Sequence, residues 1–248
     1  MYYTHLFDEV SHTSNTGEMP KQWDEKHQYL YKFDKTAITY EVYSEILCSH
    51  IANLLDIEHV EYTLQIRNGR EACCCRNFLA EDETLITPAD MILCNKYSAE
   101  EARSHMCKLN PILYSQMLLL DFLVLNTDRH YGNLGSIVGS KERMAPLFDH
   151  DAALYSSRLN DSGNPYDIVD LWCSERLYSG GIGTLLYKAA VILKGASFND
   201  IISIHSLRAN IDEIFYGLHR FSKERISSLR ALILNRLKFL EEYDGRIL

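Results

Sequence analysis

The stretch Asp121–Asp151, DFLVLNTDRHYGNLGSIVGSKERMAPLFDHD, decides which fold this sequence predicts. It begins inside an apolar run and continues into a short polar segment, residues 126–133. Two strand-like runs follow, Leu134–Val138 and Met144–Phe148, and the polar residues Gly139–Arg143 between them predict a hairpin turn. The stretch therefore predicts a buried segment, a polar loop and a β-hairpin in succession.

The register of this hairpin predicts where two oxygen-bearing side chains lie. If Val138 pairs with Met144, the same register pairs Asn133 with Asp149 at the open end of the hairpin. Paired residues on neighbouring strands have Cβ atoms roughly 5 Å apart, and Asp128 lies just before the first strand. Such a corner suits Mg²⁺, which takes one or two carboxylates and completes its shell with water and substrate phosphates.

The spacing of these residues is similar to that of the phosphoryl-transfer site of protein kinases. That site has a catalytic Asp, an Asn five positions later and a further Asp on the metal. Asp128 and Asn133 are five positions apart, and Asp149 follows an apolar run. The order Phe148-Asp149-His150 differs from the Asp-Phe-Gly of kinases, so the similarity lies in the layout.

The N-terminal half offers a lysine and a glutamate for the same site. The aromatic run His27–Phe33 predicts a strand that carries Lys32, and Thr39–Leu55 predicts a helix with Glu41 and Glu45 on one side. A carboxylate on a helix beside the strand can hold the lysine in place for phosphate binding. The alternative is an edge-strand lysine that points to water.

The remaining patterns predict a small β-rich part followed by a larger helical part. Val60–Arg67 and Glu71–Leu79 predict two strands joined by the turn pair Asn68-Gly69. The acidic segment Ala80–Ile86 is expected to leave the sheet as an extended linker, which places a boundary near residues 80–88. Beyond the boundary, helices are expected at Ser98–Lys108, Ile112–Val124, Thr184–Leu193, Ile211–Leu218 and Lys223–Tyr243.

Composition indicates a globular, cytoplasmic protein. The 248 residues are 46% hydrophobic, which suits one sizeable domain or two lobes that share a cleft. The net charge of −9 disfavours general nucleic-acid binding. Seven cysteines without a CxxC pair favour reduced thiols. The N-terminus does not have the pattern of a signal peptide, and the longest apolar run, Met117–Leu125, is too short to span a membrane.

Together these motifs resemble the HipA-like serine/threonine kinases over about residues 10–240. The resemblance rests on Asn126-Thr127-Asp128-Arg129-His130-x-x-Asn133, on Pro146-Leu147-Phe148-Asp149 and on the helix pattern Ser44-Glu45-x-x-Cys48-x-x-x-Ala52. That helix pattern is similar to the family's Asn-Glu-x-x-Cys-x-x-x-Ala, which selects Glu45 over Glu41 as the partner of Lys32. The Asp-Arg-His-x-x-Asn run is also similar to the catalytic loop of phosphoinositide lipid kinases.

The resemblance implies an α+β, two-lobed, protein-kinase-like fold. Residues 1–83 would form a small, mainly β N-lobe with one helix, and residues 84–248 a larger α-helical C-lobe. Lys32 would hold the α- and β-phosphates of ATP and pair with Glu45. Asp128 would accept the proton of the attacking hydroxyl, while Asn133 and Asp149 would hold Mg²⁺.

The resemblance also implies residues around the nucleotide. The segment Ser11–Lys21 would cover the nucleotide, although Gly17 is its single glycine where ordinary protein kinases have GxGxxG. Leu79 and Glu81 would present backbone groups to adenine, and His130 would be a structural member of the catalytic loop. Some family members carry a regulatory serine in the covering loop, so autophosphorylation is expected at one of Ser11, Thr13, Ser14 and Thr16.

Several alternatives stay open. Asp and Asn favour turns, so the polar residues could simply cap loops and helices. A two-metal phosphoesterase would use Asp128, His130, Asp149, His150 and Asp151. Within the kinase interpretation, the expected substrate is a protein serine or threonine, with a small-molecule kinase, a lipid kinase or a nucleotide-binding pseudokinase as alternatives. The family implies that the chain either has a small antitoxin-like partner protein or acts alone. The acidic net charge leads us to expect no direct contact with nucleic acid.

Overall fold

A computed structural model describes residues 19–126, 128–156, 184–194 and 196–247. Its first part is a four-stranded antiparallel sheet in the order β1-β2-β4-β3, made of β1 (Lys21–Trp23), β2 (Tyr29–Lys32), β3 (Thr63–Arg67) and β4 (Arg70–Arg76). The predicted turn between the last two strands is confirmed: Asn68 and Gly69 have φ angles of 53° and 72°. These left-handed angles are those that a tight two-residue hairpin turn requires.

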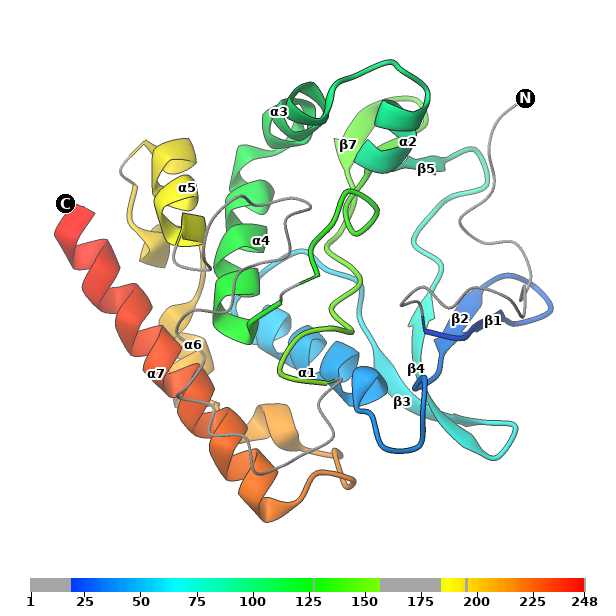
Figure 1. The fold of residues 1–248 in the computed structure, drawn as a ribbon, viewed down its shortest axis with the longest axis vertical. Helices are drawn as coiled ribbons and strands as arrows, with labels where there is room; N and C mark the ends of the chain where they lie inside the picture. Colours follow the sequence, from blue (N-terminus) through cyan, green and yellow to red (C-terminus); the bar gives the residue numbers. More distant parts are fainter. Residues whose placement is uncertain (1–18, 127, 157–183, 195, 248) are drawn as a thin grey trace.

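Helix α1 (Glu41–Leu54) confirms the predicted helix and carries the candidate glutamate. It contacts β3 and β4 on one side and α6 (Ile204–Ala209) on the other. Figure 1 shows α1 in the middle of the molecule, between the sheet and the C-terminal helices. This position explains why nearly the whole circumference of α1 is buried.

The segment Ala80–Ile86 does not remain a linker, as its composition had suggested. Its end forms β5 (Thr84–Ile86), which pairs with β6 (Ser136–Val138), and β6 pairs with β7 (Glu142–Met144). The correction has a simple cause: Leu85 is apolar, and it packs with Ile137 in a small separate cluster. Burial of these side chains favours a second sheet over an exposed linker.

The predicted register of the hairpin was wrong by two residues. Val138 pairs with Glu142 and Ser136 pairs with Met144, so the turn contains three residues instead of five. Two side-chain hydrogen bonds explain the shift, because they hold polar side chains of the strand: Glu142 accepts from His105 at 2.9 Å, and Arg143 donates to Glu83 at 3.2 Å. The strands end before Asn133 and Asp149, so no ladder places these two residues opposite each other.

The larger part of the chain is helical. Its elements are α2 (Pro88–Leu93), α3 (Ala99–Leu109), α4 (Pro111–Val124), α5 (Thr184–Leu193), η2 (Phe198–Asp200), α6, η3 (Glu213–Phe215) and α7 (Lys223–Ile247). Helix α4 is buried except for its first two residues, as its apolar sequence predicts, and it packs against α3, α5 and α7. Among the described residues, no helix has both the length and the apolar character needed to cross a bilayer.

The helix predicted over Ile211–Leu218 is instead a short 3₁₀ turn, and α6 was not predicted. Tyr216 has extended backbone angles and Gly217 has a φ of 80°. These conformations end the turn, because an α-helix needs negative φ at every residue. The other predicted helices are found within about two residues of the predicted ends, except that α7 continues four residues beyond Tyr243, to Ile247.

Candidate active site

Lys32 lies at the centre of a buried ion network that joins β2, α1 and the segment after β7. Its Nζ donates to Oε1 of Glu45 and, at 2.8 Å, to Oδ1 of Asp149. Lys32 is 3% exposed and Glu45 is fully buried. Burial lowers the pKa of Lys32, but the carboxylates of Asp149 and Glu45 raise it by more than burial lowers it. The ammonium therefore keeps its charge.

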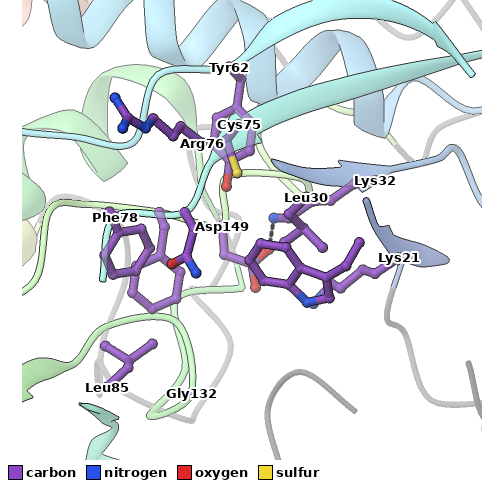
Figure 2. A pocket seen from close by; sticks show the side chains of 13 residues that line it. Lys21, Leu30, Lys32, Tyr62, Cys75, Arg76, Phe78, Leu85, Gly132 and Asp149 are labelled. Carbon is purple, nitrogen blue, oxygen red and sulfur yellow. Dashed lines mark hydrogen bonds and ion pairs between the residues drawn. The ribbon is translucent and has the colours of Figure 1, made fainter. Parts of the chain in front are cut away.

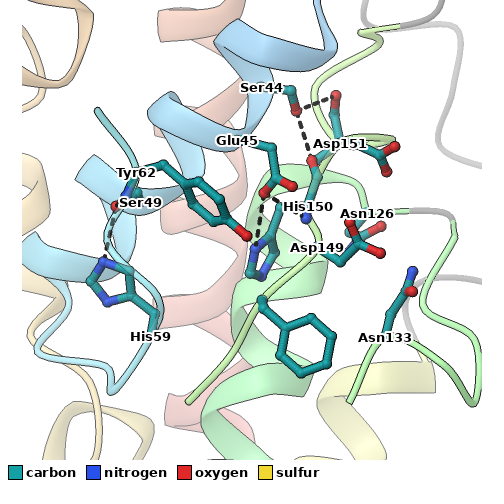
Figure 3. A network of polar contacts seen from close by, with 12 residues as sticks. Ser44, Glu45, Ser49, His59, Tyr62, Asn126, Asn133, Asp149, His150 and Asp151 are labelled. Atoms are coloured by element: carbon teal, nitrogen blue, oxygen red, sulfur yellow. Dashed lines mark hydrogen bonds and ion pairs between the residues drawn. The ribbon is translucent and has the colours of Figure 1, made fainter. Parts of the chain in front are cut away.

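Glu45 also holds the backbone of the segment that contains Asp149. Its second oxygen accepts the N–H of His150 at 2.9 Å. The neighbouring Ser44 hydroxyl donates to the carbonyls of His150 at 2.8 Å and of Ala153 at 3.0 Å, as Figure 3 shows in part. Two consecutive residues of α1 therefore fix this segment.

Asp149 adopts a backbone conformation that is uncommon for a residue other than glycine. Its φ is 64°, in the left-handed region, and such conformations persist where the surroundings hold them. Burial raises the pKa of Asp149, but the positive charges of Lys32 and Lys21 lower it more. The carboxylate, which is one fifth exposed, therefore stays ionised beside the cleft.

A second buried ion pair holds the loop 126–133 in place. Arg129 donates through Nε and Nη2 to both oxygens of Asp121, at 3.0 and 2.9 Å. Its Nη1 donates to the carbonyls of Asn133 at 2.6 Å and of Phe148 at 2.7 Å. The guanidinium therefore joins α4, the loop and the residue before Asp149.

Asp121 was not among the predicted site residues, although the sequence contains a signal for it. Asp121 interrupts the apolar run Met117–Leu125 in a helix that is buried. A buried carboxylate needs a partner to offset its lost hydration. The nearby Arg129 of the polar loop is that partner.

Asn133 and Asp128 lie together in this loop. The Asn133 side-chain amide donates to the Asp128 carbonyl at 2.9 Å, which leaves Oδ1 of Asn133 as the atom that can coordinate a cation. Figure 3 shows the side chains of Asn133 and Asp149 directed toward the same space. An amide oxygen and an ionised carboxylate are hard donors that fit Mg²⁺. The loops, rather than a strand ladder, bring these residues together.

A pocket opens between the sheet and this loop (Figure 2). It is lined by Lys21, Trp23, Leu30, Lys32, Tyr62, Cys75, Arg76, Asn77, Phe78, Leu85, Gly132, Phe148 and Asp149. The rings of Phe78 and Phe148 stack with centroids 6.1 Å apart. Figure 2 shows Phe78 on one side and the two lysines on the other. The pocket can therefore take a ligand with a flat apolar group and an anionic group.

No protein-family model and no curated protein sequence matches this chain. Among solved structures, the chain is similar to the proinflammatory kinase CtkA of Helicobacter pylori, with a TM-score of 0.70 and 17% identity over 94% of this chain and 93% of that chain. It is also similar to HipA of the Shewanella oneidensis MR-1 toxin–antitoxin system, solved with HipB and operator DNA, with a TM-score of 0.55 and 13% identity over 100% of this chain and 69% of that one.

The chain shares the fold of these two solved structures. The similarity confirms the predicted α+β class, with a small antiparallel sheet region and a larger helical part. It extends over nearly the whole chain, although fewer than one residue in five is identical. At such identity the comparison shows the fold, and the chemistry has to be argued from the site itself.

The structure does not bring every predicted nucleotide-binding residue to the pocket. Leu79 and Glu81 are not among the lining residues, and the Leu79 N–H is bonded to the Asn77 side chain at 3.1 Å. Phe78 lines the pocket instead, so a role for Leu79 and Glu81 stays a prediction. His130 lies in the loop and accepts the Gly132 N–H at 3.0 Å, whereas Gly17 and residues 11–16 lie outside the described residues.

The phosphoesterase alternative finds no support in the described part of the chain. There, no group of three or more His, Cys, Asp or Glu side chains is arranged to hold a metal ion, as a two-metal centre needs. His150 is 3% exposed, and its ring lies against Glu45. Burial lowers the pKa of His150 well below its ordinary value, so the ring stays neutral in this network.

Removal of the Asp121 carboxylate should destabilise the protein strongly. In Asp121→Ala the Arg129 charge stays buried without its carboxylate, which should lower the free energy of unfolding by roughly 3–5 kcal/mol. Urea denaturation measures this loss. Asp212→Ala is the control, because Asp212 pairs with Arg230 at the surface and its loss should cost at most about 1 kcal/mol. Equal losses in the two variants would contradict the assignment.

Stability should also depend on the ionisation of Asp151. Burial, followed by repulsion from Asp149 and Glu45, raises the pKa of Asp151 to about 7. The folded state favours the protonated acid. The contribution of Asp151 to the free energy of unfolding is therefore complete below the ordinary pKa of an aspartic acid, and it is lost as the pH rises to about 7. Asp151→Asn should reduce this loss by an amount on the order of a few kcal/mol. Urea denaturation of both proteins at pH 4 and 7 tests this, and identical pH dependence would argue against it.

Proposed function

We propose that this chain is an ATP- and Mg²⁺-dependent serine/threonine protein kinase of the HipA-like type. The observation that carries the proposal is the meeting of Lys32, Glu45 and Asp149 beside a pocket that also has an apolar, aromatic side. This arrangement suits a nucleotide, which has a flat base and a charged phosphate chain.

The nucleotide would make two kinds of contact. Lys32 would hold the α- and β-phosphates, and Lys21 supports this role, because it pairs with Lys32 in register on the neighbouring strand and lines the same pocket. The base would pack near Phe78 and Phe148. The Lys32–Asp149 hydrogen bond links an ammonium that would bind phosphate to a carboxylate that would bind Mg²⁺.

In the reaction, the acceptor hydroxyl would give its proton to Asp128 as its oxygen bonds to the γ-phosphorus and the bond to ADP breaks. Asn133 and Asp149 would hold Mg²⁺, which neutralises charge on the phosphates. The protein's contribution is mainly positioning and a fixed electrostatic environment. Arg129 supports this positioning, because it holds the carbonyls on both sides of the proposed metal site.

The wider arrangement is part of the same proposal. Residues 1–83 would form the N-lobe and residues 84–248 the C-lobe. The phosphate acceptor would be a serine or threonine of a protein substrate. One of the serines or threonines in the segment 11–16 of this chain would also accept phosphate. The HipA of Shewanella oneidensis was solved with HipB and operator DNA. We propose a small antitoxin-like partner for this chain on that basis, and the comparison lends no support to the expected absence of nucleic acid.

Nucleotide binding should depend on Mg²⁺ through Asp149. In calorimetry the wild-type protein should bind ATP more tightly when Mg²⁺ is added. Asp149→Asn removes a charged oxygen ligand, so its affinity should change less than about threefold on addition of Mg²⁺. Asp200→Asn, at an acidic residue of η2 that does not line the pocket, serves as the matched control and should behave as the wild type. An equal response in all three proteins would exclude the metal role.

Phosphate transfer should depend on Asp128. With Mg-ATP, the protein should incorporate phosphate into itself or into casein, and mass spectrometry should locate part of it in residues 11–16. Asp128→Ala should lower the rate by roughly 10²–10⁴-fold, because it removes the general base. ATP affinity should be retained. Phosphate transfer at the wild-type rate would reject the role of Asp128, and no transfer by the wild type would reject the kinase assignment.

A further inference from the structure

A segment that precedes and begins helix α7 contacts the start of α1, the helix that carries Glu45. We call His219–Arg225 the brace. Within it, Arg220 donates through Nη1 to the Asp34 carboxylate at 2.5 Å and through Nη2 to the carbonyls of Ala37 and Thr39, both at 3.1 Å. One guanidinium therefore fixes three points of the connection between β2 and α1.

The brace also packs around the first turn of α1. The Arg220 guanidinium lies 5.4 Å from the ring centroids of both Tyr40 and Tyr43. Phe221 contacts the same two rings at 5.4 and 5.2 Å, and Arg225 lies 4.1 Å from the Tyr40 centroid. Cation–π and aromatic contacts of this kind give the position of α1 directional support.

Arg220 acts on the end of α1 through Asp34. Tyr40, at the N-cap of α1, makes no side-chain capping bond, and the Asp34 carboxylate accepts the Val42 N–H at 2.8 Å instead. Burial raises the pKa of Asp34, and the Val42 N–H and Arg220 offset only part of this rise. The ionised cap therefore depends on the nearby guanidinium.

The brace reaches the segment after Asp149 as well. Arg225 donates to the carbonyls of Leu154 and Tyr155, both at 3.3 Å, and the Tyr40 N–H donates to the Ser156 carbonyl at 2.9 Å. The brace therefore contacts both the connection that leads from Lys32 to α1 and the segment that follows Asp149. Asp34 follows Lys32 by two residues, and Glu45 lies one turn beyond Val42.

We propose that Arg220 is a positioning residue, which keeps Glu45 against Lys32 by holding α1 from the C-terminal side. This inference rests on the proposed kinase function. In protein kinases the Lys–Glu pair has to form before phosphate transfer, and placement of its helix controls activity. Here the contacts that place the helix come from the brace, more than 170 residues after Glu45 in the sequence.

A double-mutant cycle tests the coupling between the two positions. Arg220→Met should lower kcat for phosphate transfer roughly 10- to 100-fold, as small misplacements do. In the Glu45→Gln background, the same change should cost less than about threefold, because the pair it positions is already broken. Arg208→Met is the control, since Arg208 pairs with Glu241 at the surface and should not affect kcat. An unchanged kcat, or equal losses in both backgrounds, would overturn the inference.

Hydrogen exchange supplies a readout that needs no activity. Arg220→Met should raise exchange of the backbone amides of residues 42–46, and Arg220→Lys should give an intermediate effect, because lysine keeps the charge beside Asp34 but not the bonds to both carbonyls. If Arg220→Met does not fold, the lysine variant carries both measurements. If the amides of residues 42–46 exchange in the variants at the wild-type rate, the positioning role of Arg220 is rejected. If the wild-type protein does not bind ATP, the kinase function is rejected, and the exchange rates alone decide whether Arg220 positions α1.

Discussion

The ammonium of Lys32 is shared by two carboxylates, and this buried triad constrains the elements that supply its members. Two of the three charged side chains are almost completely removed from water, so each depends on the others for compensation. Glu45 can reach Lys32 only if α1 keeps its position. Asp149 can reach Lys32 only if the backbone of Asp149 keeps its left-handed conformation. Ser44, Glu45 and the brace on one side, and Arg129 on the other, supply that support.

The buried charges, whose removal from water is costly for folding, lie at the proposed nucleotide site. A buried lysine with two carboxylates is a poor source of stability compared with an apolar core, so its presence points to a purpose other than folding. Under the proposed function, the phosphates of a nucleotide would give Lys32 a further partner, and Mg²⁺ would give one to Asp149. The fold alone does not carry this conclusion, because structural neighbours with 17% and 13% identity establish only the architecture.

Features with a local cause could be predicted from the sequence. The Asn68-Gly69 turn and the buried helix α4 follow from turn chemistry and apolar pattern. The order of a strand lysine and a helix glutamate suggested the ion pair, but the choice of Glu45 over Glu41 came from the resemblance to the HipA-like kinases. The hairpin register could not be predicted, because Glu142 and Arg143 are held by partners distant in the sequence. For the same reason the contacts of Arg220 with the start of α1 gave no sequence signal.

The most direct test of the central claim is a crystal structure with Mg²⁺ and a non-hydrolysable ATP analogue. The account predicts phosphate oxygens within hydrogen-bond distance of the Lys32 ammonium, the metal on Asn133 and Asp149, and the base beside Phe78. A nucleotide bound elsewhere, or a Lys32 ammonium that keeps both carboxylates and contacts no phosphate, would contradict it.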